Sequence, residues 1–586
     1  MTEKRKLSRR DFMKGAAAGV VGAAAIGVLG ACQETAPAKA TADSTSAAQT
    51  AAFAGSGQAD AAGTLDFEKY RDAKWAFEIP PEPIPEADIA DEQEAEVVVI
   101  GAGTAGLCTA VSCVEQGLKT ILISASEFPV SRGGSNHGIA SKIMKRDGIE
   151  AYDMKAVVGR EMVCAANSID HKKWVRFLKN NEEAMNWMVD LMASKNVDMA
   201  LEAGPPESYI PKDHPMYIPL AAHSVVSEDY TAGAGQPLLV QTMADILVEK
   251  GGTLIYQMKG CQLLRGDDNK GRVSGVIAEN LQDHTYHKFI GSKAVVLATG
   301  DFSADKDMMA KYCPSMLSLI ADDAGEDYDV GAKTTGLYKG DGHKMGIWVG
   351  AAWQRDEENC PMVNVAQGYC AQPYLGHCGL EVNIRGERFC NELALHSYTG
   401  HQVLMQPDKV AFAIWGTNYA KEGGPWYKRG TANKNAITDE EFIESWEANV
   451  GGKFVKGDTI EEVLQQLELP EEETMATIER YNALCEKGED EDFMKPSHCM
   501  VPIKEAPFYG ARIGGRFLTV LGGLRTNVNM QVCEEDDTPI PGLYNVGTMV
   551  GDFYHNTYTF MMQGLNLGAN CLTFGYLTGK YIAENE

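Results

Sequence analysis

The chain has 586 residues, 44% of them hydrophobic and 23% charged, which is enough for more than one domain and a large buried core. This composition excludes a wholly disordered, collagen-like or coiled-coil protein. With 53 Lys and Arg against 81 Asp and Glu, the formal net charge is −28, and such a field repels phosphate backbones, so nucleic acid is not an expected partner.

Residues 1–31 have the layout of an export signal. A basic stretch with paired Arg9 and Arg10 precedes an Ala-, Gly- and Val-rich run from Gly15 to Leu29, which is too short and too Gly-rich to cross a membrane comfortably. The motif SRRDFMK resembles a twin-arginine signal, although a basic start to an ordinary amphipathic helix is an alternative. We expect export by the twin-arginine route to the cell envelope, on the periplasmic side of the cytoplasmic membrane.

A cysteine ends the apolar run, in Leu29-Gly30-Ala31-Cys32. This resembles a lipobox, in which Cys32 would be acylated and become the mature N-terminus; the alternative is an ordinary cleavage site that carries a cysteine. Residues 32–63 are rich in Ala, Thr, Ser, Gly and Gln and cannot bury enough apolar surface to fold. We expect a flexible linker there, with Cys32 as a candidate lipid anchor.

The 14 cysteines are scattered, and no C-x-x-C or C-x-x-C-H is present. This spacing does not support a zinc ribbon, a ferredoxin-like cluster or covalent c-type haem, so we expect no metal. Most cysteines, such as Cys108 and Cys113, are expected to be small buried hydrophobic residues. One looser group leaves a cluster ligand set open: Cys360, Cys370, Cys378 and Cys390.

A nucleotide-binding pattern begins at Ala95–Ile100, an apolar run typical of a buried parallel strand. The sequence G-x-G-x-x-G follows and leads into a helical stretch. Gly101 allows the tight turn, Gly103 allows a pyrophosphate to approach, and Gly106 lets the helix pack on the strand. The helix N-terminus would face the phosphates. This pattern predicts a dinucleotide site.

The second predicted strand, Lys119–Ile123, ends in Ser124. Dinucleotide-binding folds usually place Glu or Asp there to contact the ribose. That acidic contact is missing at this position, so we expect Ser124 to occupy it.

Further motifs follow in a fixed order. They are SRGGS at Ser131–Ser135, AVVLATG at Ala294–Gly300 followed by Asp301-Phe302, GDGH at Gly340–His343, RFCNE at Arg388–Glu392, Tyr481-Asn482, and PGLYNVG at Pro541–Gly547. In order and spacing they resemble the fumarate reductase/succinate dehydrogenase flavoprotein family, in particular its soluble branch of flavocytochrome c fumarate reductases, urocanate reductase and 3-ketosteroid dehydrogenases. The resemblance covers residues 95–586 and implies FAD rather than NAD.

The resemblance implies an α/β protein with a Rossmann-like FAD-binding domain and an inserted α+β capping domain. The FAD-binding domain would occupy 95–356 and 506–586, and the cap 357–505. The residues agree with a cap of this kind, because 438–485 is helix-rich and contains a capping box that starts at Thr459. Closure of such a cap excludes water from the flavin.

The resemblance also implies where FAD is held. The backbone N–H groups of Leu567–Cys571, at the start of the last helix, would face the flavin N1/C2=O edge and stabilise negative charge on the reduced flavin. FAD should be non-covalent, because Gly133 takes the position of the linking histidine of the membrane-bound members. The implied cofactor-binding residues are Gly101, Gly103, Gly106, Ser124, Gly133, Gly134, Ser135, Thr299, Gly300, Asp301, Asp341, Gly342, Gly547, Gly568, Ala569 and Asn570.

The match fails at the positions that bind a dicarboxylate in soluble fumarate reductases. His396 stands where they carry a proton-delivering Arg, Thr519 where they carry a His, and Asn566 where they carry a carboxylate-binding Arg. Their Thr-Glu substrate clamp falls on Ala371 and Gln372. A carboxylate in a dry pocket without Arg partners is strongly disfavoured. We therefore expect that fumarate and succinate are not substrates.

The candidate proton donors lie in two places: His396, Tyr398 and His401 just past the RFCNE motif, and Tyr554, His555 and Tyr558 ahead of the last helix. His and Tyr both serve as general acids, and the ketosteroid dehydrogenases use Tyr. His396 and Tyr558 are preferred, although each could be a packed aromatic residue instead. The richness in Tyr, Phe and Met at 553–562 favours a small apolar or aromatic electron acceptor, or is simply core.

Three functional hypotheses follow. The first is an exported FAD-dependent reductase of an activated C=C bond in an organic acceptor, serving anaerobic respiration. With no haem motif and no second G-x-G-x-x-G, it would take electrons from a membrane-bound cytochrome or quinol-oxidising subunit. The second is an FAD-dependent CH–CH dehydrogenase of a steroid-like substrate. The third is a non-catalytic flavin-binding lipoprotein or electron carrier.

Overall fold

The computed structural model describes residues 74–151, 153–202, 221–230, 234–319, 337–366, 379–393, 396–423 and 438–586. The predicted signal, the linker and Cys32 lie outside the described residues. The chain divides into two units, Met1–Pro81 and Glu82–Glu586. The described part of the first is a short segment with a single helical turn at Ala76–Glu78, in which the Trp75 and Phe77 rings stack.

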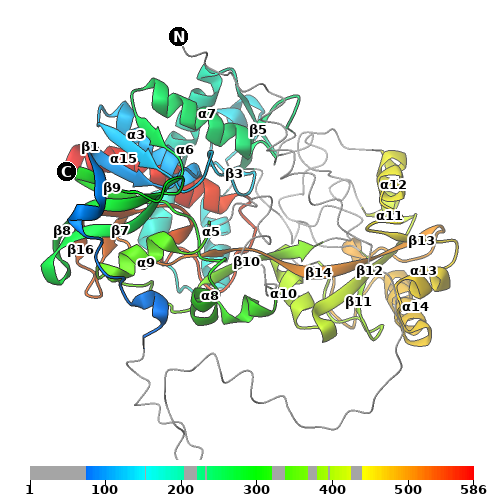
Figure 1. Ribbon diagram of the computed structural model, residues 1–586. Helices are drawn as coiled ribbons and strands as arrows, with labels where there is room; N and C mark the ends of the chain where they lie inside the picture. Colours follow the sequence, from blue (N-terminus) through cyan, green and yellow to red (C-terminus); the bar gives the residue numbers. More distant parts are fainter. Residues whose placement is uncertain are drawn as a thin grey trace, which may run out of the picture. The chain divides into compact units, whose positions relative to one another are not determined.

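The second unit, within its described residues, is organised around an eight-stranded sheet (Figure 1). The main order is β15-β16-β9-β1-β2-β6, and β8 joins β9 and pairs with β7. β1 runs parallel to β2 and β9, and β16 runs parallel to β9. The strands are β1 (Ile89–Ile100), β2 (Thr120–Ile123), β6 (Thr253–Ile255), β7 (Met258–Gly266), β8 (Lys270–Asn280), β9 (Tyr286–Leu297), β15 (Gln531–Cys533) and β16 (Pro539–Asn545).

The centre of this sheet is apolar because both of its faces are covered. Val97, Val98 and Val99 of β1 have no exposed surface, and Val98 pairs with Ile121 and Val295. Buried parallel strands are typically continuous apolar runs of this kind. The predicted strands at 95–100 and 119–123 are therefore confirmed, although β1 begins earlier, at Ile89, with a half-exposed first part.

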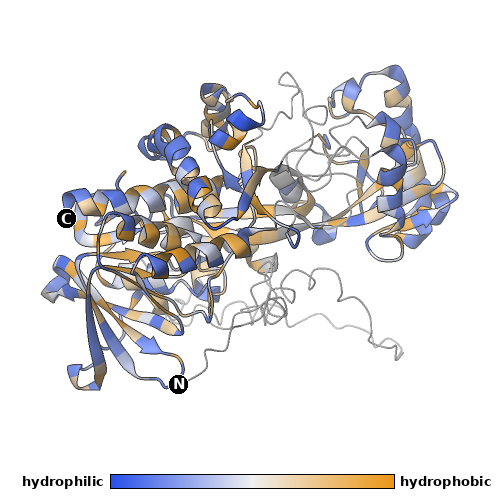
Figure 2. Cartoon of the chain, turned by 90° about the horizontal axis from the view of Figure 1, so that it is seen from above, coloured by the Kyte–Doolittle hydropathy of each residue, from blue (hydrophilic) through white to orange (hydrophobic). Residues whose placement is uncertain are grey.

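Helices α3 (Thr104–Glu115), α7 (Gln236–Glu249) and α15 (Phe574–Asn585) pack together in the helical layer against the sheet. α15 lies close to α3 at Gly575, where an added Cβ would stand only 2.9 Å from the Cβ of Cys108. Figure 2 shows apolar residues concentrated in the strands and in these helices, with hydrophilic residues on the outward surfaces. The other helices of this part are α4 (Lys142–Arg146), α5 (Met154–Cys164), α6 (His171–Ser194), α8 (Lys306–Tyr312) and α9 (Asp341–Trp348).

Two antiparallel sheets complete the described fold. A five-stranded sheet has the order β10-β14-β12-β11 with β13 on β14, and a three-stranded sheet has the order β3-β5-β4. Their strands are β3 (Asn136–His137), β4 (Asp198–Leu201), β5 (Ala222–Val226), β10 (Cys360–Ala366), β11 (Leu380–Asn383), β12 (Val410–Gly416), β13 (Val455–Gly457) and β14 (Phe508–Leu521). The parallel central sheet with added antiparallel sheets confirms the predicted α/β class.

The five-stranded sheet carries the remaining helices, α10 (His396–Leu404), α11 (Tyr419–Glu422), α12 (Asp439–Glu447), α13 (Ile460–Gln466) and α14 (Glu471–Lys487). The helix-rich stretch and the capping box at Thr459 are confirmed, because Thr459 Oγ1 accepts from Glu462 N and Glu462 accepts in return. β14 pairs with β10, β12 and β13, so this sheet draws on both 357–505 and 506–586. The domain boundaries themselves stay a prediction.

Within the described part of the chain, no helix combines the length and the apolar character needed to cross a membrane.

Candidate active site

The glycine motif forms a turn between β1 and α3 that has no room for side chains. Gly101 has φ +116°, and a Cβ there would stand 2.2 Å from the Ala298 carbonyl oxygen. A Cβ at Gly106 would stand 1.9 Å from the Gly101 carbonyl oxygen. Gly103, by contrast, caps α3 without a side-chain bond and has only a distant backbone neighbour at 3.8 Å. The first N–H groups of α3 are thus left for a phosphate, as a dinucleotide requires.

Ser124 supports this turn from the end of β2. Its Oγ accepts a hydrogen bond from Ala102 N (3.3 Å) and lies 2.8 Å from Ser126 Oγ. Ser124 is buried, so the position that usually carries a ribose-binding acid here braces the phosphate loop.

The SRGGS segment lies against the start of the last helical stretch. Gly133 has φ +71°, and a Cβ there would stand 3.3 Å from a Leu567 methyl group. Gly134 is buried, and Ser135 Oγ donates a hydrogen bond to Glu202. The structure therefore brings Gly133, Gly134 and Ser135 close to the predicted flavin-edge segment.

His137, next to this segment, is fully buried, and its Nδ1 lies 3.0 Å from the Gln563 carbonyl oxygen. Burial lowers the pKa of His137 to about 3, so the ring is neutral at physiological pH. Non-covalent attachment of FAD remains a prediction.

Two of the predicted cofactor-binding segments meet at Thr299. Thr299 Oγ1 accepts a hydrogen bond from Gly342 N (3.1 Å), and a Cβ at Gly342 would stand 2.3 Å from the same oxygen. Gly300 has φ +82°. Asp341, partly exposed at the start of α9, has an ion pair with Lys259 at 3.4 Å.

Asp301, predicted to contact FAD, is occupied by a buried ion pair. Arg132 Nη1 lies 2.7 Å from Asp301 Oδ2, and Thr519 Oγ1 donates a hydrogen bond to the same oxygen. Burial alone would raise the pKa of Asp301, but the Arg132 charge and the hydrogen bonds from Thr519 and Ser303 hold it below its ordinary value. Asp301 thus links the SRGGS segment to β14, and Thr519 is a structural partner.

The flavin-edge segment is a π-helix, η12 (Leu567–Thr573), ahead of α15. A Cβ at Gly547 would stand 2.9 Å from the Ala105 Cβ, and one at Gly568 would stand 2.1 Å from the His137 carbonyl oxygen. Ala569 and Asn570 are fully buried, and Asn570 Oδ1 has no hydrogen-bond partner among the described residues. Glycines that admit no side chain and a buried polar atom without a protein partner fit a bound flavin.

The loop at residues 551–563, just ahead of η12, is anchored by the first turns of α6. Lys173 Nζ donates to the Gly551 carbonyl oxygen (2.7 Å), and Trp174 Nε1 donates to the Phe553 carbonyl oxygen (3.0 Å). The Trp174 and Phe553 rings also stack at 4.7 Å. The position of this loop is therefore fixed by a helix nearly four hundred residues earlier in the chain.

Two tyrosines of this loop meet at Asn566. Tyr554 Oη donates to Asn566 Oδ1 (3.4 Å), and Asn566 N donates to Tyr558 Oη (3.4 Å). Asn570 Nδ2 also donates to Asn566 Oδ1 (3.2 Å). Tyr554 and Tyr558 are 7% and 3% exposed, and burial is the main cause that raises the pKa of Tyr554 well above its ordinary value. A neutral amide and two phenols thus meet at the start of η12.

His555, another predicted acid, contacts a residue outside this cluster. His555 forms an ion pair with Asp356, which is 46% exposed, so its recorded partner faces solvent. His396 and Tyr398 belong to the first turn of α10, and their side chains, like Ala371 and Gln372, lie outside the described residues. The structure therefore brings Tyr558 to the start of η12, and the catalytic roles stay predictions.

Glu161 of α5 is a site residue that the sequence analysis missed. It is 5% exposed and accepts a hydrogen bond from Thr559 Oγ1 (2.6 Å), next to Tyr558. Burial raises the pKa of Glu161 to about 7. A Glu on a mostly exposed helix gives no signal in the sequence, because its contact with Thr559 joins residues 398 positions apart.

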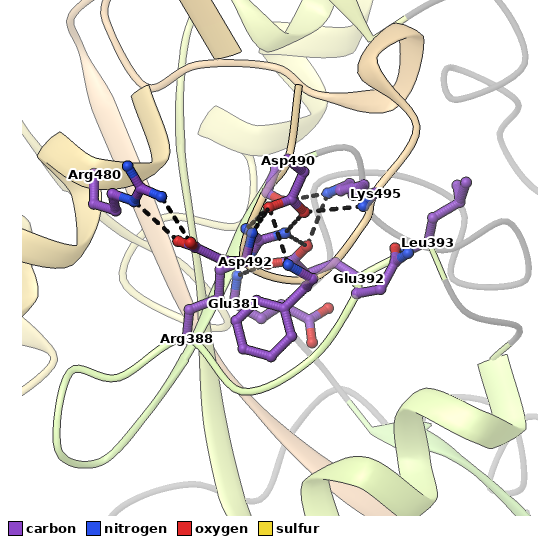
Figure 3. A network of polar contacts seen from close by, with 11 residues as sticks. Glu381, Arg388, Glu392, Leu393, Arg480, Asp490, Asp492 and Lys495 are labelled. Carbon is purple, nitrogen blue, oxygen red and sulfur yellow. Dashed lines mark hydrogen bonds and ion pairs between the residues drawn. The ribbon is translucent and has the colours of Figure 1, made fainter. Parts of the chain in front are cut away.

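The RFCNE motif is held by a buried network of charges in the region of the five-stranded sheet (Figure 3). Arg388 binds Glu392 with two hydrogen bonds of 2.8 and 2.9 Å and Asp490 with two of 3.0 and 2.7 Å. Lys495 Nζ lies 3.1 Å from Glu392, and the side chains of Glu392, Asp490 and Lys495 have no exposed surface. Burial alone would raise the pKa of Asp490, but Arg388 lowers it to about 2. This network holds the RFCNE motif in place.

All cysteines in the described residues are free, and most are buried. Cys370 and Cys378 of the looser group lie outside those residues. In the described part of the chain, no group of three or more His, Cys, Asp and Glu is placed to hold a metal ion.

Comparison with known proteins agrees with this geometry. A model of the FAD binding domain family matches residues 96–561. The chain is 24% identical to the vinyl phenol reductase of Lactiplantibacillus plantarum over 84% of this chain and 96% of that protein. It is 25% identical to the urocanate reductase of Eggerthella lenta over 86% and 76%.

Among solved structures, a 3-ketosteroid-Δ4-(5α)-dehydrogenase from Rhodococcus jostii RHA1 superposes with a TM-score of 0.62 at 23% identity, covering 84% of this chain and 97% of that chain. That likeness concerns the fold. Because the family match spans more than half of the chain, and the glycine turn and η12 fit a flavin, the chain belongs to the FAD binding domain family and is an FAD-dependent oxidoreductase.

Proposed function

We propose that this enzyme reduces an activated C=C bond in an organic acceptor that is bulkier and less charged than fumarate. The observation that carries the proposal is the cluster of Tyr554, Tyr558 and Asn566 at the start of η12. Binding a carboxylate in a buried site that offers no cation is unfavourable by about 3–5 kcal/mol, because the buried charge is left unpaired. A phenol, enone or other neutral oxygen can instead exchange hydrogen bonds with hydroxyl and amide groups.

Bound FAD supplies the hydride for such a reduction. The protein must then deliver one proton to the carbon next to the one that receives the hydride, and Tyr558 or Tyr554 provides a hydroxyl for this role. Tyr554 and Tyr558 are buried, and the rings of Tyr558 and Phe560 meet edge to face at 4.7 Å. The two phenols therefore stand among aromatic rings with little exposure to water. A vinyl phenol, the substrate class in the name of one relative, carries an aromatic ring and a C=C bond and no carboxylate.

The alternative is a dehydrogenase of a CH–CH unit in a steroid-like ketone. It is favoured by the tyrosine pair, since the phenolate left when a tyrosine protonates a carbon is the base that removes this proton in the reverse direction. It is also favoured by the fold shared with a ketosteroid dehydrogenase. Direction is set by the electron partner, which we propose to be a membrane-bound cytochrome or quinol-oxidising subunit. Export by the twin-arginine route and a lipid anchor at Cys32 would keep the enzyme beside that partner.

The test is an anaerobic assay in which reduced viologen is oxidised by a panel of acceptors: fumarate, urocanate, 4-vinylphenol, a 4-hydroxycinnamate ester and a steroid enone. We expect turnover with one or more of the uncharged acceptors and none with fumarate. Fumarate turnover at a rate equal to that of the best uncharged acceptor would contradict the proposal. Oxidation of a saturated ketone with a dye acceptor, without any alkene reduction, would favour the dehydrogenase.

A further inference from the structure

Helix α5 directs the carboxyl group of Glu161 towards the protein interior. Most of its side chains are exposed, yet Val158 and Glu161 are buried. A buried carboxyl is unfavourable unless it is paired or neutral. Its recorded hydrogen bond comes from the Thr559 hydroxyl, and Arg160 on the same helix adds a weaker attraction. An apolar residue would fill this place more favourably, and such local exceptions are expected at functional sites.

An ionised Glu161 would place its charge within electrostatic reach of one tyrosine of the cluster, Tyr554. Tyr554, on the loop ahead of η12, and Cys360, at the start of β10, both feel the charge of the Glu161 carboxylate. Together with Arg160 they are the titratable groups recorded as acting with Glu161 in the described part of the chain. Burial raises the pKa of Glu161 from 4.5 to about 7, so this carboxyl changes its charge near neutral pH.

Glu161 also holds a strained turn. The loop has three non-glycine residues in the left-handed region, Asp552 (φ 62°), Asn556 (φ 50°) and Phe560 (φ 59°). Thr559 Oγ1, which donates to Glu161, accepts in turn from Met561 N at 3.1 Å, so it bridges the helix and the turn at Phe560. Backbone conformations of this kind persist only where the surroundings fix them.

We propose that Glu161 is a positioning residue for the Tyr554–Tyr558 pair, holding the turn beside Tyr558 through Thr559 and setting by its own charge how readily the pair releases a proton. As a neutral acid it keeps the turn in place and leaves the phenols able to donate. Once ionised, it places a negative charge beside Tyr554, which opposes formation of a phenolate. The proposal rests on the proposed function, because it takes the tyrosine pair as the acid.

The pH dependence of turnover in the full-length, FAD-loaded protein tests this role. Glu161 holds its proton below pH 7 and loses it above, so wild-type kcat should fall about tenfold between about pH 6 and pH 8.5. Glu161→Gln keeps a hydrogen-bonding partner for Thr559 but cannot ionise, so its kcat should change less than about twofold over that range. Identical pH profiles in wild type and Glu161→Gln would overturn the proposal.

Two further variants separate charge from anchoring. Thr559→Val keeps the carboxyl and removes its anchor, so kcat should be lower at both pH values while the fall with pH remains. Glu183→Gln, on the exposed part of α6, should leave the wild-type profile unchanged. A Thr559→Val protein with wild-type kcat would overturn the anchoring role.

A spectroscopic readout does not depend on finding a substrate. Difference infrared spectra of the oxidised protein should contain a carboxyl band that titrates near neutral pH and that Glu161→Gln removes; its absence would overturn the proposal even in an active enzyme. If no acceptor is reduced, the proposed function fails, and ultraviolet titration of the tyrosines decides about Glu161. The tyrosine midpoint that a Tyr554→Phe substitution removes must then lie lower in Glu161→Gln than in wild type.

Discussion

Gly106 determines how closely α3 approaches the end of β1, since a single added methyl group would overlap the Gly101 carbonyl oxygen. Gly103 has a different role, because the space beside it is open and is left to a ligand. The two glycines therefore explain two separate requirements of the motif, close packing of helix on strand and access to the helix N-terminus. At this scale the flavin site and the proton donor can be tested one side chain at a time.

Gly106→Ala should shift α3 and weaken FAD binding. Overpacking of this kind destabilises a protein by about 1–3 kcal/mol. FAD content per purified chain should fall, together with the midpoint of thermal unfolding. Gly159→Ala on α5 is the matched control, because nothing lies within 4 Å of its added Cβ. Full FAD content in Gly106→Ala would argue against the predicted phosphate site.

Tyr558→Phe should slow acceptor reduction without loss of FAD. Removing a general acid lowers rates by about 10²–10⁴-fold, and Phe keeps the ring that packs on Phe560. Rapid-mixing kinetics should show unchanged reduction of the flavin by viologen and slow reoxidation by the acceptor. Tyr576→Phe, whose hydroxyl binds exposed Glu183, is the control. Unchanged reoxidation in Tyr558→Phe would move the acid to Tyr554, Tyr398, His396 or His555.

At the scale of elements, local patterns could be predicted and long-range contacts could not. The strand, glycine turn and helix at 95–117 and the capping box at Thr459 follow from residues adjacent in sequence, and the structure confirms them. The anchoring of the 551–563 loop by Lys173 and Trp174 depends on residues hundreds of positions apart. The motif predicted that Asp301 lies near the cofactor site, but it did not predict the partner of this carboxylate. The ion pair with Arg132 is a tertiary contact.

The network around Arg388 should be essential to the stability of the five-stranded sheet region. Asp490→Asn removes one partner of a buried ion pair, which destabilises by about 3–5 kcal/mol. Because Arg388 lowers the pKa of Asp490 to about 2, this contribution is present above about pH 4 and is lost as the pH falls towards 2. Denaturant unfolding at neutral pH measures the difference.

Glu182→Gln is the control for that experiment, because Glu182 forms an exposed pair with Lys145 on the surface. Its effect should stay within about 1 kcal/mol. Equal stabilities of Asp490→Asn and Glu182→Gln would contradict a structural role for the network.

For the whole molecule, location is a proposal carried by the first 63 residues, which lie outside the described structure. A field from a net charge of −28 does not favour an anionic membrane surface, so attachment would depend on a lipid or on a protein partner. The central sheet joins β1 and β16, which lie far apart in the sequence. Both parts of the chain must therefore be present for the FAD-binding fold to form, and folding before export would suit the twin-arginine route.

Replacing Arg9 and Arg10 with Lys should keep the folded, FAD-loaded enzyme in the cytoplasm. Cell fractionation and flavin fluorescence of each fraction measure this, and Lys4→Arg serves as a control that preserves charge outside the pair. Labelled palmitate on wild type but not on Cys32→Ala would establish the anchor. Unchanged export of the double Lys variant would point to the general secretory route instead.

We propose that this flavoenzyme binds its acceptor at the tyrosine–amide cluster of Tyr554, Tyr558 and Asn566, where the described residues offer no cation for a dicarboxylate. The most direct measurement is single-turnover reoxidation of the reduced, FAD-loaded protein on mixing with fumarate or with 4-vinylphenol at equal concentration. We expect the uncharged alkene to reoxidise the flavin at least about a hundredfold faster, since an unpaired buried carboxylate is unfavourable by several kcal/mol. Reoxidation by fumarate at an equal or greater rate would contradict the proposal.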